Sequence, residues 1–168
     1  HRITRIARRT LDALLILLIL FVLAIVLLAR GIPALTGGTT FVVGGGSMEP
    51  TIPLGAVVVS IPAADEELAV GDVVSIQVGQ QRAVFTHRIV RLAELPDGLH
   101  IETKGDANAD SDPSLVPATA VIGRVALTVP YAGFGVALLG SMQGILFLLS
   151  FAGVLLAAAW LLETLEDE

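Results

Sequence analysis

The stretch GDVVSIQVGQQRAVFTHRIVRL, residues 71–92, holds two short runs of β-branched and aromatic side chains on either side of a polar segment. Such side chains favour strands, and the glycine and polar residues between the runs favour a turn. Three further runs have the same texture: GAVVVSIP (55–62), LHIETKG (99–105) and VIGRVALTV (121–129). Short strands that recur at this spacing predict an all-β sheet or a small barrel.

An apolar run precedes this β region. Residues 11–29, LDALLILLILFVLAIVLLA, would form a helix that crosses a hydrocarbon core of about 30 Å. A cleavable signal peptide is the alternative, but its apolar region is only about 7 to 15 residues long and a small-residue cleavage site follows it. Because Arg30 stands where that site would be, we predict a retained transmembrane helix.

A second apolar run, residues 134–162, carries no charge and is also long enough to cross a bilayer. Its glycines and Ser141 leave the start of the helix open. The arginines near the N-terminus favour a cytoplasmic N-terminus. We therefore predict five segments along the chain. Residues 1–10 lie in the cytoplasm, residues 11–29 form a transmembrane helix and residues 30–133 form an extracytoplasmic β domain. Residues 134–162 form a second transmembrane region, and residues 163–168 form an acidic cytoplasmic tail.

Composition agrees with a membrane protein, because 54% of the 168 residues are hydrophobic and only 15% are charged. The chain is too short for a multidomain enzyme, since one domain takes about 100 to 150 residues. It has no cysteine, which excludes disulfides and thiolate metal sites. The region between the apolar runs is acidic, which argues against a nucleic acid as partner.

The first candidate for chemistry is the segment GGGSMEPT, residues 44–51. Its glycines allow another chain to approach the backbone closely, so Ser47 could be presented on a tight turn with its N–H exposed. Pro50 would stiffen the exit from that turn. The alternative is a flexible linker between the membrane helix and the sheet. Met48 could fill the core or contact the bilayer surface.

The second candidate is His87, within the strand-like run VFTHRIV. A hydroxyl nucleophile needs a base whose pKa is near 7, and histidine is the side chain whose unperturbed pKa lies closest. A structural or exposed strand histidine is the alternative. Because the other histidines, His1 and His100, have no motif around them, His87 is the leading candidate for a base.

The third candidate is the acidic segment TKGDANADSD, residues 103–112, with Asp106, Asp110 and Asp112 around Asn108. It resembles a fragment of a calcium loop, but it lacks the sixth-position glycine and the distal glutamate of an EF-hand. It could also be a solvated turn. In the functional interpretation, one carboxylate accepts the second N–H of a histidine and holds the productive tautomer.

Five motifs in order resemble those of the signal peptidase I family, in the branch that archaea share with the endoplasmic reticulum and some Gram-positive bacteria. They are SMEPT (47–51), GDVV (71–74), THRIV (86–90), KGDAN (104–108) and VIGRV (121–125). In that branch the base is histidine, whereas the common bacterial enzymes use lysine. Lys104, the only lysine, falls in the acidic motif and not at the base position.

This resemblance implies a serine endopeptidase that removes signal peptides, with nucleophile Ser47, base His87 and carboxylates at Asp106 and Asp112. It implies a mostly β catalytic domain between two transmembrane helices, on the extracytoplasmic face of the cell membrane. The expected partners are signal-peptide-bearing preproteins, the lipid bilayer and the protein export channel. No cofactor and no metal are expected. An inactive, membrane-tethered β domain for binding or scaffolding is the alternative.

The two carboxylates can be given separate roles from the local sequence. Asp106 follows Gly105, which permits a sharp turn, and we predict that Asp106 orients His87. Asp112 precedes Pro113, which biases it towards an extended conformation, so we predict a structural turn or an ion pair with Arg88 or Lys104. The family has serine or a similar residue two places before the nucleophile. This chain has Gly45 there, which leaves part of the oxyanion hole unassigned.

Overall fold

The structure is a computed structural model that describes residues 2–79 and 83–166. His1 and the tail residues Asp167 and Glu168 lie outside the described residues. The chain divides into two compact units, which are described separately. One unit is a β domain of residues 28–134, and the other combines the N-terminal segment up to residue 27 with the C-terminal segment from residue 135.

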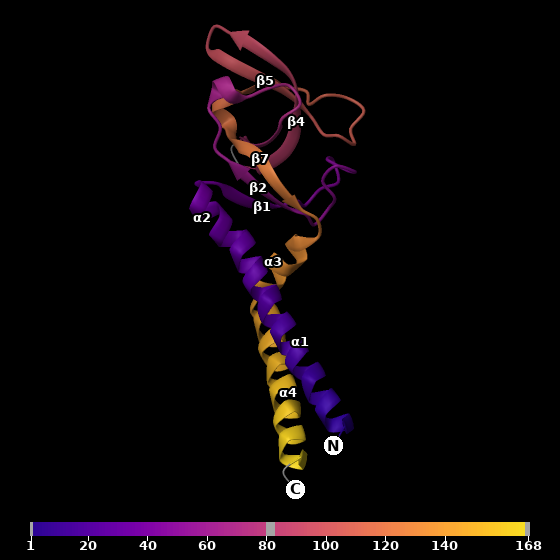
Figure 1. Cartoon of the computed structure of the whole chain (residues 1–168). Coiled ribbons are helices and arrows are strands. Elements are labelled where there is room, and N and C mark those ends of the chain that lie inside the picture. The colour runs from indigo at the N-terminus through magenta and orange to yellow at the C-terminus, as the bar shows by residue number, and fades with distance from the viewer. Residues whose placement is uncertain (1, 80–82, 167–168) are drawn as a thin grey trace. The chain divides into compact units, whose positions relative to one another are not determined.

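The β domain is built on one antiparallel sheet with strand order β1-β2-β7-β3-β4-β5-β6 (Figure 1). The strands are β1 (Thr39–Val42), β2 (Val57–Ile61), β3 (Val73–Val78), β4 (Ala83–Leu95), β5 (Gly98–Lys104), β6 (Val116–Pro117) and β7 (Val121–Val129). The five runs of β-branched residues correspond to β2, β3, β4, β5 and β7. The predicted mostly β fold is therefore confirmed.

Two short strands were not predicted. β1 pairs with β2, and β6 pairs with β5 through only two residues. Strands of two to four residues show too little alternation of apolar and polar side chains to stand out in a sequence. They matter for the site, because β1 leads into the segment that carries Ser47 and β6 ends the acidic loop.

The core of the β domain has two parts. One lies among β3, β4 and β5 and includes Val74, Ile89 and Ile101, all fully buried. The other holds Met48, Ile52, Ala56 and Val58. Met48 is only 1% exposed, so it is a core residue and makes no contact with a bilayer surface. Burying such a side chain contributes about 1.5 to 3 kcal/mol, which fixes the turn directly after Ser47.

The helical unit contains all of α1 (Arg2–Val26) and all of α4 (Met142–Glu166). The first helical segment continues through a π-helical turn (Leu27–Gly31) and α2 (Ile32–Thr36), and α3 (Ala132–Gly140) precedes α4. Two stretches, Thr4–Thr36 and Met142–Thr164, are long and apolar enough to cross a membrane. α1 begins before the predicted window, where the flanking arginines are good helix formers, and α4 ends four residues after its window, at Glu166.

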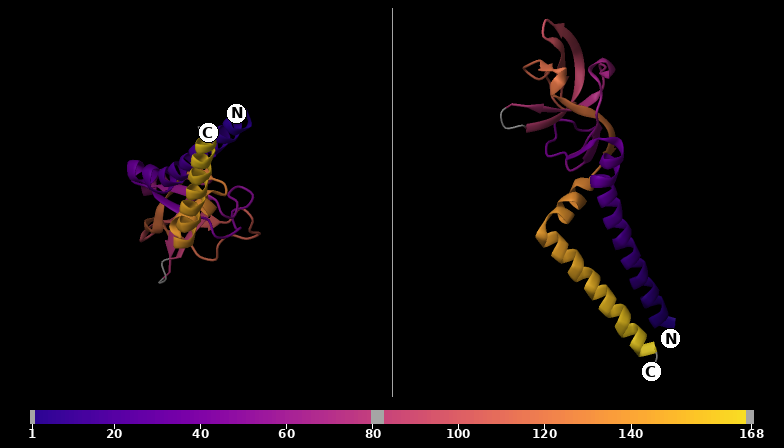
Figure 2. Two further views of the ribbon diagram at one scale, coloured as in Figure 1. Left: turned by 90° about the horizontal axis from the view of Figure 1, so that it is seen from below. Right: turned by 90° about the vertical axis from the view of Figure 1, so that its left-hand side faces the viewer.

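The uncertain start of the second apolar run coincides with a break in the helix. α3 ends at Gly140 and α4 begins at Met142, and Figure 2 shows the chain bending there. The ends of α1 and α4 lie close together in all views (Figures 1 and 2), and Arg8 donates to Glu163 at 3.2 Å. The start of α1 and the end of α4 therefore lie at the same end of the helical unit.

Candidate active site

Ser47 lies in a structured turn between β1 and β2. Backbone bonds from Glu49 N to Gly46 O (3.1 Å) and from Ile52 N to Met48 O (2.8 Å) close this turn. The buried side chains of Met48 and Ile52 hold it against the sheet. The alternative of a flexible linker between helix and sheet is therefore wrong, because the segment follows β1 and is tied to the core.

The acidic loop packs directly on this turn. The backbone N–H of Ala107 donates to the carbonyl of Ser47 at 2.8 Å. Gly105 is buried at the contact, where a Cβ would lie 2.6 Å from Ser47 O and 3.0 Å from Ser47 Cβ. Only glycine allows so close an approach. The position of Ser47 therefore depends on the loop as well as on its own turn.

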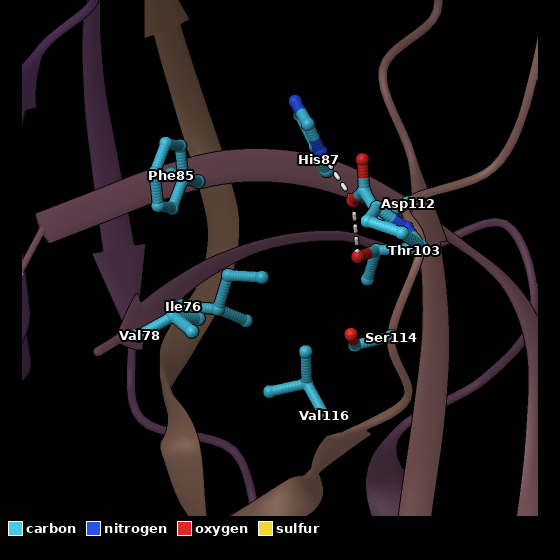
Figure 3. A pocket seen from close by; sticks show the side chains of 9 residues that line it. Ile76, Val78, Phe85, His87, Thr103, Asp112, Ser114 and Val116 are labelled. Atoms are coloured by element: carbon cyan, nitrogen blue, oxygen red, sulfur yellow. Dashed lines mark hydrogen bonds and ion pairs between the residues drawn. The ribbon is translucent and has the colours of Figure 1, made fainter.

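His87 lies on β4, opposite Val74 of β3, and is 8% exposed. Its Nε2 is 3.0 Å from Ser47 Oγ, and its Nδ1 is 2.6 Å from Asp112 Oδ2. An ionised carboxylate can only accept, so Nδ1 carries the proton and donates to Asp112. Nε2 is then free to accept from the Ser47 hydroxyl. The three side chains form one continuous line, of which Figure 3 shows the His87–Asp112 contact.

The roles predicted for the two carboxylates are wrong, because the structure places each aspartate where the other was expected. Asp106 does not contact His87 through a hydrogen bond but accepts two bonds from Arg88, from Nε at 2.8 Å and from Nη2 at 2.7 Å. Asp112, expected to pair with Arg88 or Lys104, contacts His87 instead. Successive side chains on a strand point to opposite faces, so the neighbours His87 and Arg88 draw the carboxylates to different places.

Lys104 takes part in neither carboxylate contact. Its Nζ donates to the carbonyl of Ala109 at 2.8 Å and so ties down the middle of the acidic loop. The exposed Asp110 belongs to the same loop. Among the described residues, no three acidic or histidine side chains gather as metal ligands.

The pair of Arg88 and Asp106 is an electrostatic anchor beside the site. Hydrogen bonds from the Arg88 guanidinium lower the pKa of the Asp106 carboxyl, and a bond from the Thr51 hydroxyl acts in the same direction. In return, Asp106 raises the pKa of Arg88. Arg88 also donates to the carbonyl of Gly71 at 2.8 Å. The pair therefore joins the Ser47 turn, β4 and the acidic loop.

Two cavities border His87. The larger, about 530 Å³, lies between the segment around Ser47 and the start of β4, and its lining comprises Phe41, Val42, Val43, Gly44, Gly45, Ser47, Met48, Val84, Phe85, Thr86 and His87. The smaller, about 290 Å³, has Asp112, Thr103 and mostly apolar neighbours in its wall (Figure 3). Phe85 and His87 belong to both linings, whereas Ser47 belongs only to the larger cavity.

Sequence reasoning missed Thr103, which donates to Asp112 Oδ2 at 2.6 Å. It stands at the start of the acidic segment, but nothing local shows which loop residue its hydroxyl reaches. His100, set aside for lack of a motif, lies in the β4–β5 hairpin, where its Nδ1 is 3.1 Å from Gly98 O. It is not among the residues gathered around Ser47.

No family model matches the chain. Several curated proteins do, and two of them are described here. The human protein "Putative signal peptidase complex catalytic subunit SEC11B" is 29% identical over 120 residues, which cover 66% of this chain and 72% of the human protein. The Bacillus subtilis protein "Signal peptidase I W" is 41% identical over 83 residues, which cover 49% of this chain but only 43% of the Bacillus protein.

Proposed function

We propose that this chain is a member of the signal peptidase I family and acts as a membrane-bound serine endopeptidase that removes N-terminal signal peptides from exported proteins, a proposal that its similarity to two signal peptidases supports. One observation supports the assignment of its residues above all others. Ser47 Oγ, the His87 ring and the Asp112 carboxylate stand in hydrogen-bonded sequence, with separations of 3.0 and 2.6 Å. This arrangement has the components of a serine protease triad.

In the proposed reaction, Ser47 Oγ attacks the peptide carbonyl while His87 Nε2 takes its proton. Asp112 stabilises the imidazolium that forms and keeps Nδ1 protonated. The imidazolium then gives its proton to the leaving amine, and a water molecule hydrolyses the acyl-enzyme by the same route. Asp106 takes no part in these proton transfers, because it is occupied by Arg88.

The oxyanion would be held by the backbone N–H of Ser47 and by a second donor. Position 45 is a glycine, so no side chain is available there. We propose that a backbone amide of residues 44–46 takes this role. Loss of one such donor typically raises the barrier by about 3 to 4 kcal/mol, so the second donor matters for turnover.

The larger cavity is the proposed substrate site, because it is the one that Ser47 lines. An extended segment of the preprotein would lie along β1 and β4 and place alternate side chains towards the wall. Small residues at the first and third positions before the cut fit the family's pattern. The apolar wall of Phe41, Val43 and Phe85 suits small aliphatic side chains.

The proposed location is a cell membrane crossed twice, with the β domain on the extracytoplasmic face. The two apolar helices and the shared end of the helical unit support this arrangement. Preproteins and the bilayer are the proposed partners, and the export channel is a further expected neighbour. The proposed topology leaves both the N-terminus and the acidic tail in the cytoplasm.

Cleavage of a defined precursor in liposomes tests the function. The Ser47→Ala variant should produce no mature product at enzyme concentrations where the unmodified chain cleaves fully. Ser60→Ala is the matched control, because Ser60 is buried on β2 and its hydroxyl is hydrogen-bonded to Ser75. Cleavage by Ser47→Ala at an appreciable rate would refute the proposal. The alternative, an inactive scaffolding domain, is not favoured; it would require that the unmodified chain also fail to cleave.

A further inference from the structure

Thr103 is a fully buried residue whose hydroxyl is committed to the site. Its exposed fraction is 0%, and its Oγ1 donates to Asp112 Oδ2 at 2.6 Å (Figure 3). The same oxygen accepts from His87 Nδ1 at 2.6 Å. One carboxylate oxygen is thus held between a donor on β5 and a donor on β4.

We infer that Thr103 is a positioning residue for the reaction, which acts through Asp112 to set the orientation of His87. This inference rests on the proposed function and deepens it. Thr103 lies outside the lining of the cavity that contains Ser47, so it would not touch the reacting atoms. Its role is to hold the carboxylate that holds the base.

Asp112 needs such support because it lies on a loop. Residues 105–115 contain no helix or strand, and Pro113 follows directly. The backbone of Asp112 is tied to β5 by one bond, from its N–H to Thr103 O at 2.8 Å. Thr103 therefore holds Asp112 at two points, through its backbone carbonyl and through its side-chain hydroxyl. We call these two contacts the Thr103 clamp.

The strand register transmits this clamp to His87. Thr103 pairs with Ile89 of β4, and Ile89 lies two residues beyond His87 on the same face of the strand. The distance between the Thr103 hydroxyl and the imidazole is therefore set by the pairing of β4 with β5. Asp112 Oδ2 bridges the two, at 2.6 Å from each. Without the hydroxyl, the carboxylate is free to rotate, and Nδ1 loses a fixed acceptor.

The test compares Thr103→Val, which keeps the shape and removes the donor, with Thr103→Ser, which keeps the donor. A hydrogen bond to a charged group of this kind predicts a fall in kcat of about 10- to 100-fold in Thr103→Val, with KM changed less than about 2-fold. Thr103→Ser should recover kcat to within about 3-fold of the unmodified chain. Ser60→Ala again controls for loss of a buried strand hydroxyl and should keep full kcat.

A second arm shows whether Thr103 acts through Asp112. In an Asp112→Asn background, measured in single-turnover reactions with enzyme in excess, adding Thr103→Val should lower the rate by no more than about 2-fold. An undiminished loss in that background would overturn the inference. So would full kcat in Thr103→Val, or failure of Thr103→Ser to recover it.

The same set of variants distinguishes a loss of folding from a loss of activity. Melting temperatures are measured for each variant, and Thr103→Ala provides a second donorless variant if Thr103→Val does not fold. If both unfold, the hydroxyl is structural and the inference is wrong. Ser47→Ala decides the proposed function independently: inactivity of Ser47→Ala with full activity of Thr103→Val would refute only the role of Thr103.

Discussion

At the scale of single residues, the site depends on which aspartate binds to each of two adjacent side chains on β4. His87 and Arg88 are adjacent in sequence but point to opposite faces of the strand, and each holds a different aspartate. Asp112 orients a ring, and Asp106 neutralises a guanidinium. Replacing each aspartate by asparagine should therefore have a different effect, although both aspartates lie in one short segment.

Asp112→Asn should behave as a tautomer defect. An amide in this place can donate to Nδ1, which favours the wrong tautomer and leaves Nε2 protonated, unable to accept from Ser47. Turnover of precursor should fall by about 10³- to 10⁴-fold, while the melting temperature changes little. The measurement is kcat alongside thermal unfolding at one pH. Turnover within about 10-fold of the unmodified chain would contradict the orientation role.

Asp106→Asn should mainly lower stability, by about 1 to 3 kcal/mol at neutral pH, because it breaks a two-point contact with Arg88. Since Arg88 depresses the pKa of Asp106 in the folded chain, this contribution is present above the pKa of an unfolded aspartate, about 3.9. It is lost as the pH falls through the folded pKa.

Unfolding of both proteins across a pH series tests this prediction. The stability gap between the unmodified chain and Asp106→Asn should be full at neutral pH and should shrink as the pH drops below about 4. Precursor cleavage by Asp106→Asn should fall less than cleavage by Asp112→Asn. A gap that is constant with pH would show that ionisation of Asp106 is not what stabilises the fold.

At the scale of elements, the site is an intersection of three pieces: the turn after β1, the strand β4 and the loop between β5 and β6. The turn and the loop approach each other so closely at Gly105 that there is no room for a Cβ atom. Gly105 contributes no Cβ at the point where the loop meets the Ser47 carbonyl, and its replacement would force the two pieces apart.

Gly105→Ala should therefore damage activity and stability together. The added carbon would sit 2.6 Å from a backbone oxygen, which cannot move without moving Ser47. We expect a loss of about 1 to 3 kcal/mol in stability and a fall in turnover of more than about 10-fold. Gly153→Ala is the control, since a Cβ there meets nothing within 4 Å. Normal turnover in Gly105→Ala would mean that the loop yields without displacing the nucleophile.

At the scale of the whole molecule, two apolar helices are joined to a β domain that carries the site on a turn, a strand and a loop. The ends of α1 and α4 lie together, and the Arg8–Glu163 ion pair joins them. If both helices cross a bilayer, the two chain ends must therefore emerge on the same side of it.

Protease protection tests this topology. In right-side-out vesicles, residues 42–129 should be cleaved by an added protease, whereas tags at the two termini should be protected. In inverted vesicles the pattern should be reversed. Detergent-treated vesicles serve as the control for accessibility. Protection of the β domain in right-side-out vesicles would contradict the proposed orientation.

The sequence by itself determined the apolar helices, the longer strands and the candidate residues of the site. Apolar runs of about 20 residues specify membrane-length helices, and β-branched runs between turn residues specify strands, because both signals act over neighbouring positions. The motifs around Ser47, His87 and the acidic segment also identified the serine, the histidine and both aspartates that the structure gathers, but not Thr103. Only the tertiary structure decided which aspartate meets His87. That choice depends on the β4–β5 register, on alternation of side chains along β4 and on the Thr103 clamp, each of which joins residues distant in sequence. A local pattern such as the turn signal at Gly105 contains no information about those distances.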